Sequence, residues 1–121
     1  MLEVKTLFFI INKGLQGSVC GQEFLDVALM AAAFDQKVVM LFEDEGVNAL
    51  VKNQHPERIG LKNIAPILNA LPIYDINDVL VEKESLDAWG LDEEQLDIGV
   101  TLVSRREIKK QLNSADHVFS F

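Results

Sequence analysis

Five short apolar runs recur along the chain and predict the strands of a β-sheet. The first two runs are almost continuously apolar, which is typical of parallel strands that are buried on both faces. Each run also has roughly the four to eight residues that a buried strand needs. The runs occupy residues 4–11 (VKTLFFII), 37–42 (KVVMLF), 76–81 (INDVLV), 98–103 (IGVTLV) and 116–121 (DHVFSF).

Segments with helical spacing lie between these runs. In residues 18–34 an apolar stripe includes Cys20 and Ala28, and Ser18 is the expected N-cap. Shorter helices are expected at 47–51, 64–71, 85–89 and 104–113. Gly90 is placed to end the third of these in a left-handed conformation. Strands that alternate with helices predict an α/β fold, here a three-layer α/β/α sandwich with a mainly parallel sheet of about five strands.

Length and composition favour one domain, residues 1–121, with ample material for a core, since 49% of the 121 residues are hydrophobic. The sequence has no run of about eighteen apolar residues, so we expect no membrane span. Its first residues lack the basic region and cleavage site of a signal peptide. A single cysteine cannot make an internal disulfide. We therefore expect a cytoplasmic protein.

The net charge of −8 is concentrated in one segment, residues 75–97. This segment has nine acidic residues and one lysine, whereas the rest of the chain has ten acidic and ten basic residues. It contains the third predicted strand, which stops at Glu82 and Lys83 just before a short helix. Open α/β sheets place their sites at the carboxyl ends of strands, so this is the expected site. The acidic balance argues against direct binding to nucleic acid and could steer a basic partner.

Several kinds of chemistry are not expected from this sequence. It contains no P-loop, no dinucleotide-binding glycine fingerprint and no nucleophile elbow. Its two histidines, His55 and His117, are far apart in sequence, so we expect no metal site and no cofactor. The glycine-rich loop 14–18 could present backbone N–H groups to a small anion, although such loops mostly just make a turn. The acidic residues in 43–46 are expected to form a solvated loop.

Two side chains have competing interpretations. Cys20 lies near a helix start, where a thiolate would be favoured, but its place on the apolar stripe favours burial as a small hydrophobic residue. Trp89 could anchor a partner protein, or it could cover the edge of its own core. For Cys20 we expect packing rather than reactivity.

Four segments resemble a known family. They are AAAFDQKVVMLFEDEGVNAL (31–50), IGLKNIAPILNALPIYDI (59–76), VLVEKESLDAWGLDEEQL (79–96) and SADHVFSF (114–121). In this order they resemble the DsrF/TusC subunits of DsrEFH/TusBCD sulfur relay complexes over nearly the whole chain. The stretches 34–36, 60–63 and 84–86 are most similar to DsrF.

The resemblance implies the same α/β/α fold and an assembly of three homologous subunits as a dimer of heterotrimers. The implied partners are DsrE/TusD-like and DsrH/TusB-like chains, and sulfur travels as a persulfide on a cysteine of the DsrE/TusD-like subunit. That cysteine follows the third strand, and the matching place here is at 81–83, with Glu82 where the relay paralogues have Cys. The resemblance therefore implies no catalytic residue in this chain and gives Cys20 no role. Glu82, Lys83 and Trp89 become candidates for interface residues.

Alternatives remain open at this point. The downstream process could be sulfur oxidation or the synthesis of 2-thiouridine in tRNA. The chain could instead be a stand-alone thiol or persulfide enzyme that uses Cys20. It could also be a homo-oligomeric small-molecule-binding domain that uses the loops 14–18 and 43–46.

Overall fold

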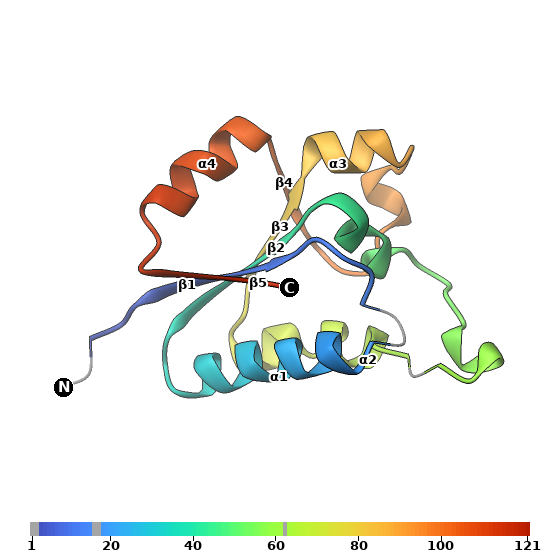
Figure 1. Cartoon of the computed structure of the whole chain (residues 1–121), viewed down its shortest axis with the longest axis horizontal. Coiled ribbons are helices and arrows are strands. Elements are labelled where there is room, and N and C mark those ends of the chain that lie inside the picture. The colour runs from blue at the N-terminus through green and yellow to red at the C-terminus, as the bar shows by residue number, and fades with distance from the viewer. Residues whose placement is uncertain (1–2, 16–17, 62) are drawn as a thin grey trace.

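A five-stranded parallel sheet lies at the centre of the computed structural model, which describes residues 3–15, 18–61 and 63–121 (Figure 1). The strand order is β4-β3-β2-β1-β5, and every neighbouring pair is parallel. The strands are β1 (Thr6–Ile11), β2 (Lys37–Phe42), β3 (Asp78–Glu82), β4 (Thr101–Val103) and β5 (His117–Ser120). The predicted parallel sheet of about five strands is confirmed.

Helices cover both sides of this sheet. Figure 1 shows α1 (Val19–Ala33) and α2 (Ala65–Asn69) on one side, with α3 (Lys83–Ala88) and α4 (Arg105–Asn113) on the other. Short 3₁₀ helices connect these elements: η1 (Asp44–Leu50), η2 (Pro56–Ile59), η3 (Leu71–Tyr74) and η4 (Glu93–Gln95). The arrangement is the three-layer sandwich that the alternating pattern predicts. Within the described residues, no helix is long and apolar enough to cross a bilayer.

The two-residue period of β3 decides which way its last side chain points. Val79 and Val81 belong to the apolar cluster that includes the α1 residues Leu25 and Ala28. Leu80 belongs to the smaller cluster that includes Ile108 of α4. Because side chains alternate along a strand, Glu82 shares the α4 face with Leu80. The polar end of β3 is therefore directed toward α4.

Several element boundaries differ from the expected ones. The helix expected at 47–51 is the 3₁₀ helix η1, which begins at Asp44 directly after β2. Here the chain passes so close to β1 that a Cβ on Gly46 would lie 2.0 Å from the Ile11 carbonyl oxygen. The strand expected at 98–103 pairs only over β4, and α3 begins at Lys83, immediately after β3. Gly90 has a φ of +67°, which confirms its expected left-handed conformation.

The prediction that Cys20 is buried was wrong, because its side chain is exposed. Ser18 does cap α1, accepting a hydrogen bond from the Gly21 N–H at 2.9 Å. The buried positions of α1 are Gly21, Leu25 and Ala28, so the core-facing stripe passes one residue beyond Cys20. Gly21 packs closely, since a Cβ there would lie 2.8 Å from Leu15 Cδ2. In the first turn of α1, Gly21 therefore faces the core and Cys20 faces solvent.

Candidate functional site

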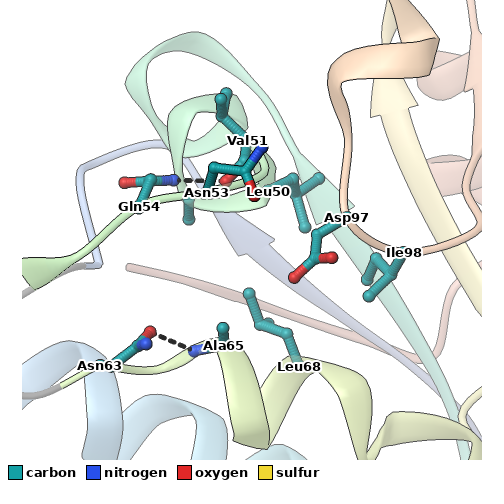
Figure 2. A pocket seen from close by; sticks show the side chains of 10 residues that line it. Leu50, Val51, Asn53, Gln54, Asn63, Ala65, Leu68, Asp97 and Ile98 are labelled. Atoms are coloured by element: carbon teal, nitrogen blue, oxygen red, sulfur yellow. Dashed lines mark hydrogen bonds between the residues drawn. The ribbon is translucent and has the colours of Figure 1, made fainter.

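A hollow of about 210 Å³ lies between the end of η1 and the start of α2 (Figure 2). Most of the amide groups that line it hold the local backbone. The Gln54 amide donates to the carbonyl oxygens of Asn48 and Val51, and Asn63 Oδ1 accepts from the Ala65 N–H at 3.0 Å. These amide side chains therefore hold the loop between η1 and α2 in place, and we assign no catalytic or binding role to this hollow.

A second hollow, of about 350 Å³, lies at the carboxyl ends of β2 and β3, beside α4. Its walls combine charged groups from three parts of the chain with apolar side chains of α4. The lining residues are Glu43, Asp44, Glu82, Arg105, Ile108, Lys109 and Leu112. This is the place where the sequence predicted a site, because Glu82 ends β3 there.

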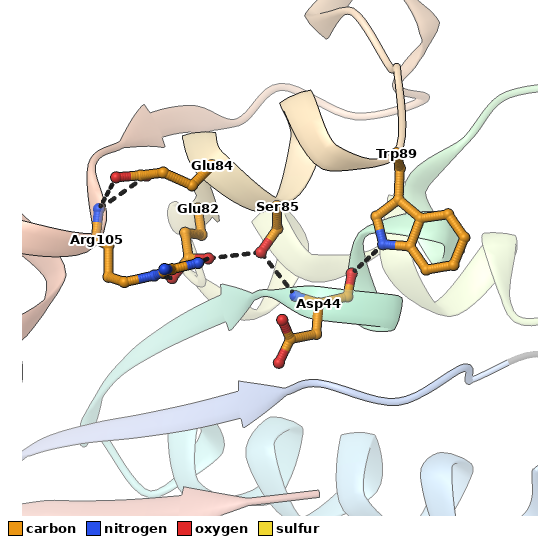
Figure 3. Close-up of polar contacts among 6 residues, drawn as sticks. All are labelled: Asp44, Glu82, Glu84, Ser85, Trp89 and Arg105. Carbon is orange, nitrogen blue, oxygen red and sulfur yellow. Dashed lines mark hydrogen bonds and ion pairs between the residues drawn. The ribbon is translucent and has the colours of Figure 1, made fainter.

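Glu82 is a buried carboxylate, only 3% exposed, and both of its oxygens are hydrogen-bonded (Figure 3). Arg105, the first residue of α4, approaches it with two nitrogens: Nη2 lies 2.9 Å from Oε1 and Nε lies 3.2 Å from Oε2. The Ser85 hydroxyl donates to Oε1 at 2.6 Å. Paired donors of this kind fix both the position and the charge of a carboxylate.

Further hydrogen bonds connect Glu82 to the surface beyond α3. The Ser85 hydroxyl, which donates its O–H to Glu82, also accepts from the Asp44 N–H at 2.9 Å. The Asp44 carbonyl in turn accepts from the indole N–H of Trp89 at 3.0 Å (Figure 3). The chain of contacts runs from Arg105 through Glu82 and Ser85 to η1, and then to Trp89 at the end of α3. These elements hold one another in place.

The start of α4 is fixed by carboxylates and a hydroxyl. The Glu84 carboxylate accepts from the Arg105 backbone N–H at 2.9 and 3.1 Å. A negative charge at a helix start is favourable, because the first N–H groups lack partners within the helix. Ser104 also caps α4 by accepting from the Glu107 N–H at 3.2 Å. The junction of β3 and α3 therefore positions both parts of Arg105, its side chain through Glu82 and its backbone through Glu84.

The pKa values of two carboxyl groups in this hollow, Glu82 and Glu43, are shifted in opposite directions. Hydrogen bonding to Arg105 lowers the pKa of Glu82, and its bond to Ser85 acts in the same direction against the effect of burial. Burial raises the pKa of Glu43, and the nearby charges of Glu82 and Asp44 add to this effect. The hydrogen bonds and the charge of Glu82 in turn raise the pKa of Arg105. At neutral pH the hollow therefore contains a fixed Glu82–Arg105 ion pair.

Of the three predicted interface residues, Lys83 and Trp89 lie near this hollow and face solvent, whereas Glu82 is buried. Lys83 is exposed at the first position of α3. Trp89 is 50% exposed, with its N–H bonded and much of its ring accessible. Arg105 and Ser85 were not anticipated from the sequence. The sequence could have indicated Arg105, because the carboxyl ends of parallel strands lie at the same edge of a sheet. Glu82 is the last residue of β3, and Arg105 comes shortly after the end of β4.

The other candidate residues are distributed over different parts of the fold. Cys20 lies on α1, on the opposite side of the sheet from Glu82. In the loop 14–18, residues 16 and 17 lie outside the described residues, and the Ser18 side chain is used as the α1 cap. In 43–46, Glu43 is half-buried in the hollow beside Glu82, so this segment is only partly the solvated loop that was expected.

Comparison with known proteins gives consistent results. The sequence matches the model of the DsrE/DsrF-like family over residues 5–121. It is 33% identical to the intracellular sulfur oxidation protein DsrF of Allochromatium vinosum, covering 98% of this chain and 97% of that protein. It is also 33% identical to the TusC homolog of Pseudomonas aeruginosa, covering 96% of this chain and 98% of that protein. The crystal structure of the E. coli YchN protein has the same fold, with a TM-score of 0.79 at 21% identity over 98% of this chain and 100% of that chain. Given a family match over nearly its whole length and these similarities to DsrF and TusC, the chain belongs to the DsrE/DsrF-like family.

Proposed function

We propose that this chain is a subunit of a sulfur relay complex that supports persulfide transfer but carries no sulfur itself. Family membership and the names of relatives, DsrF and TusC, support the relay part of the proposal. The observation that carries the second part is the Glu82–Arg105 ion pair. It occupies the place after β3 where, by the resemblance, a relay subunit has its cysteine.

The chemistry of persulfide transfer explains why this observation matters. An acceptor thiolate attacks the outer sulfur of a persulfide, the S–S bond breaks, and the donor leaves as a thiolate. One sulfur atom moves, with no net oxidation or reduction of the pair. The Glu82 carboxylate cannot form such a bond, and its two oxygens already accept from Arg105 and Ser85. Its charge would also disfavour a thiolate beside it.

The proposed partners are a DsrE/TusD-like chain, which supplies the cysteine, and a DsrH/TusB-like chain. The three would form a dimer of heterotrimers in the cytoplasm, with Glu82, Lys83 and Trp89 near the contacts. The last two are exposed on α3 and at its end, next to the hollow. The process served would be either sulfur oxidation or tRNA thiolation, as the two kinds of relatives suggest.

Native mass spectrometry of the tagged chain isolated from its own host tests this proposal. We expect two co-purifying chains of similar size, one of which has a cysteine after its third strand. After incubation with a persulfide donor, that cysteine chain should gain the mass of one sulfur atom and this chain should not. Isolation of this chain alone, as a monomer or homo-oligomer, would contradict the proposal.

A deletion in the same host then separates the two processes. Loss of 2-thiouridine from total tRNA, measured by mass spectrometry of nucleosides, would assign the chain to tRNA thiolation. Unchanged tRNA with a defect in the oxidation of stored or supplied sulfur would assign it to sulfur oxidation.

One observation favours a second candidate function, a stand-alone thiol enzyme, because Cys20 is exposed. The purified chain, incubated alone with glutathione persulfide, would then gain a sulfur atom and pass it to an added thiol. The Cys20→Ser variant is the matched control. No sulfur gain by the purified chain would remove this candidate.

A further inference from the structure

The hollow at the carboxyl ends of β2 and β3 contains more charged groups than its ion pair uses. Its volume of about 350 Å³ falls within the range of roughly 300–1,000 Å³ that is typical of small-molecule sites. Glu82 and Arg105 neutralise each other there. Among the described residues, the other charged groups that line the hollow (Glu43, Asp44 and Lys109) belong to no ion pair. These groups are therefore free to bind the charges of a ligand.

The negative charges come from the segment that follows β2. We call Glu43 and Asp44 the carboxylate pair. Glu43 is half-buried, and its burial raises its pKa, with the charges of Glu82 and Asp44 adding to the effect. Arg105 lowers the same pKa, but this is the smallest of the four influences. A cation from outside the chain, placed against the carboxylate pair, would relieve the repulsion that remains.

The positive charges come from α4. We call Arg105 and Lys109 the cation pair; they are four residues apart, so they lie on the same side of the helix. Arg105 uses its Nε and Nη2 for Glu82, and a guanidinium has further N–H donors on its other nitrogen that can bind an anion. The backbone N–H of Arg105 is already bonded to Glu84. The anion would therefore be bound by side chains and not by the helix start.

α4 also gives the hollow an apolar wall. We call Ile108 and Leu112 the apolar pair; both line the hollow, and they too are four residues apart. A simple anion would be repelled by the carboxylates of the hollow, and a simple cation by the cation pair. In the described part of the chain, no three side chains lie together as metal ligands. A ligand with one charge of each sign and an alkyl group matches all three pairs.

From this arrangement we infer that the hollow binds a free α-amino acid with an aliphatic side chain. The ammonium group lies against the carboxylate pair, the carboxylate against the cation pair, and the alkyl group against the apolar pair. The hollow is at the carboxyl ends of parallel strands, where open α/β sheets bind their ligands. The inference does not rest on the sulfur relay proposal, because the ligand contacts only this chain.

An NMR titration of the purified chain, with labelled isoleucine and leucine methyl groups, tests the inference. Adding L-leucine, L-isoleucine or L-valine should shift the methyl signals of Ile108 and Leu112 in a saturable way. Three probes each lack one group of L-leucine: N-acetyl-L-leucine has no ammonium, L-leucinamide has no carboxylate, and glycine has no alkyl side chain. Each should bind about tenfold or more weakly than L-leucine, because a charged hydrogen bond or a buried alkyl group is missing.

Two charge-removing variants identify the partner of each ligand group. Glu43→Gln should weaken L-leucine binding about tenfold without weakening N-acetyl-L-leucine further. Lys109→Gln should weaken L-leucine but not L-leucinamide. The matched controls Glu45→Gln and Lys110→Gln remove the same charges at exposed positions nearby that do not line the hollow, and they should bind like the unmodified chain. All four variants leave Glu82 and Arg105 unchanged.

Three outcomes would overturn the inference. The first is that none of the three aliphatic amino acids shifts the methyl groups of Ile108 and Leu112. The second is that L-leucinamide or N-acetyl-L-leucine binds as tightly as L-leucine. The third is that the control variants lose as much binding as Glu43→Gln and Lys109→Gln. None of these outcomes bears on the relay proposal, which the co-purification experiment tests separately.

Discussion

Replacing Glu82 by cysteine should show whether the end of β3 retains the electrostatic environment of a thiolate site. The substitution is made in a chain whose own cysteine is removed by Cys20→Ser, so that only one thiol is present. The new thiol would point toward Arg105 Nε and Nη2 and the Ser85 hydroxyl, which now bind the carboxylate. We expect it to react faster than the same thiol in a chain that also has Arg105→Gln.

The expected size of the effect follows from the distances. The sulfur would lie about two bond lengths short of the present carboxylate oxygens, which are 2.9 and 3.2 Å from the guanidinium nitrogens. An opposite charge within about 4–6 Å raises the dissociation constant of an acid by roughly 10- to 1000-fold. Because the Arg105 side chain is 60% exposed, solvent screening favours the low end, about tenfold. A more acidic thiol is also a weaker nucleophile, which leaves a net rate difference of roughly threefold.

Stopped-flow reaction with a chromogenic disulfide measures this difference. The midpoint of the pH–rate profile should lie about one pH unit lower when Arg105 is present. Burial opposes ionisation of the thiol in both chains and so cancels in the comparison. Equal rates and equal midpoints, in two variants that fold normally by circular dichroism, would refute the reasoning that Arg105 acts on this position.

Other predictions concern stability. The folded-state pKa of Glu82 is below its ordinary value of 4.5, so its stabilisation is present above that pH and is lost as the pH falls through the lower value. Chemical denaturation should therefore show a smaller acid loss for Glu82→Gln than for the unmodified chain. The pKa of Glu43 is raised, so its contribution makes the free energy of unfolding fall as the pH rises through and above 4.5. The variant Glu43→Gln should remove that fall. A steeper fall in the variant would contradict the assignment. Leu25→Ala should lower the free energy of unfolding by about 2–5 kcal/mol in urea titrations, whereas exposed Val27→Ala on the same helix should change it by less than about 0.5 kcal/mol. Gly46→Ala should prevent η1 from closing on β1, seen as a lower melting temperature, and an unchanged value would show that the backbone can move aside.

The sequence by itself determined the elements and the edge of the sheet where charged groups meet. Five apolar runs predict the strands, and the first two are almost continuously apolar because a buried parallel strand must be apolar on both faces. Ser18 and Gly90 mark helix ends through interactions with neighbouring residues, so local patterns identify them. The end of β3 at Glu82 was predicted for the same reason, since a strand that meets a helix is a local signal.

Only the tertiary structure decided which distant groups pair there. Glu82 and Arg105 are 23 residues apart and meet because β3 and β4 are neighbours in the sheet. The exposure of Cys20 also depends on tertiary structure, because it is set by how α1 is rotated on the sheet and where its first turn projects. Periodicity gives the width of an apolar stripe, but the elements packed against it decide which residue at its border is covered. Local interactions fix where an element begins and ends, while strand order and packing fix what its side chains meet.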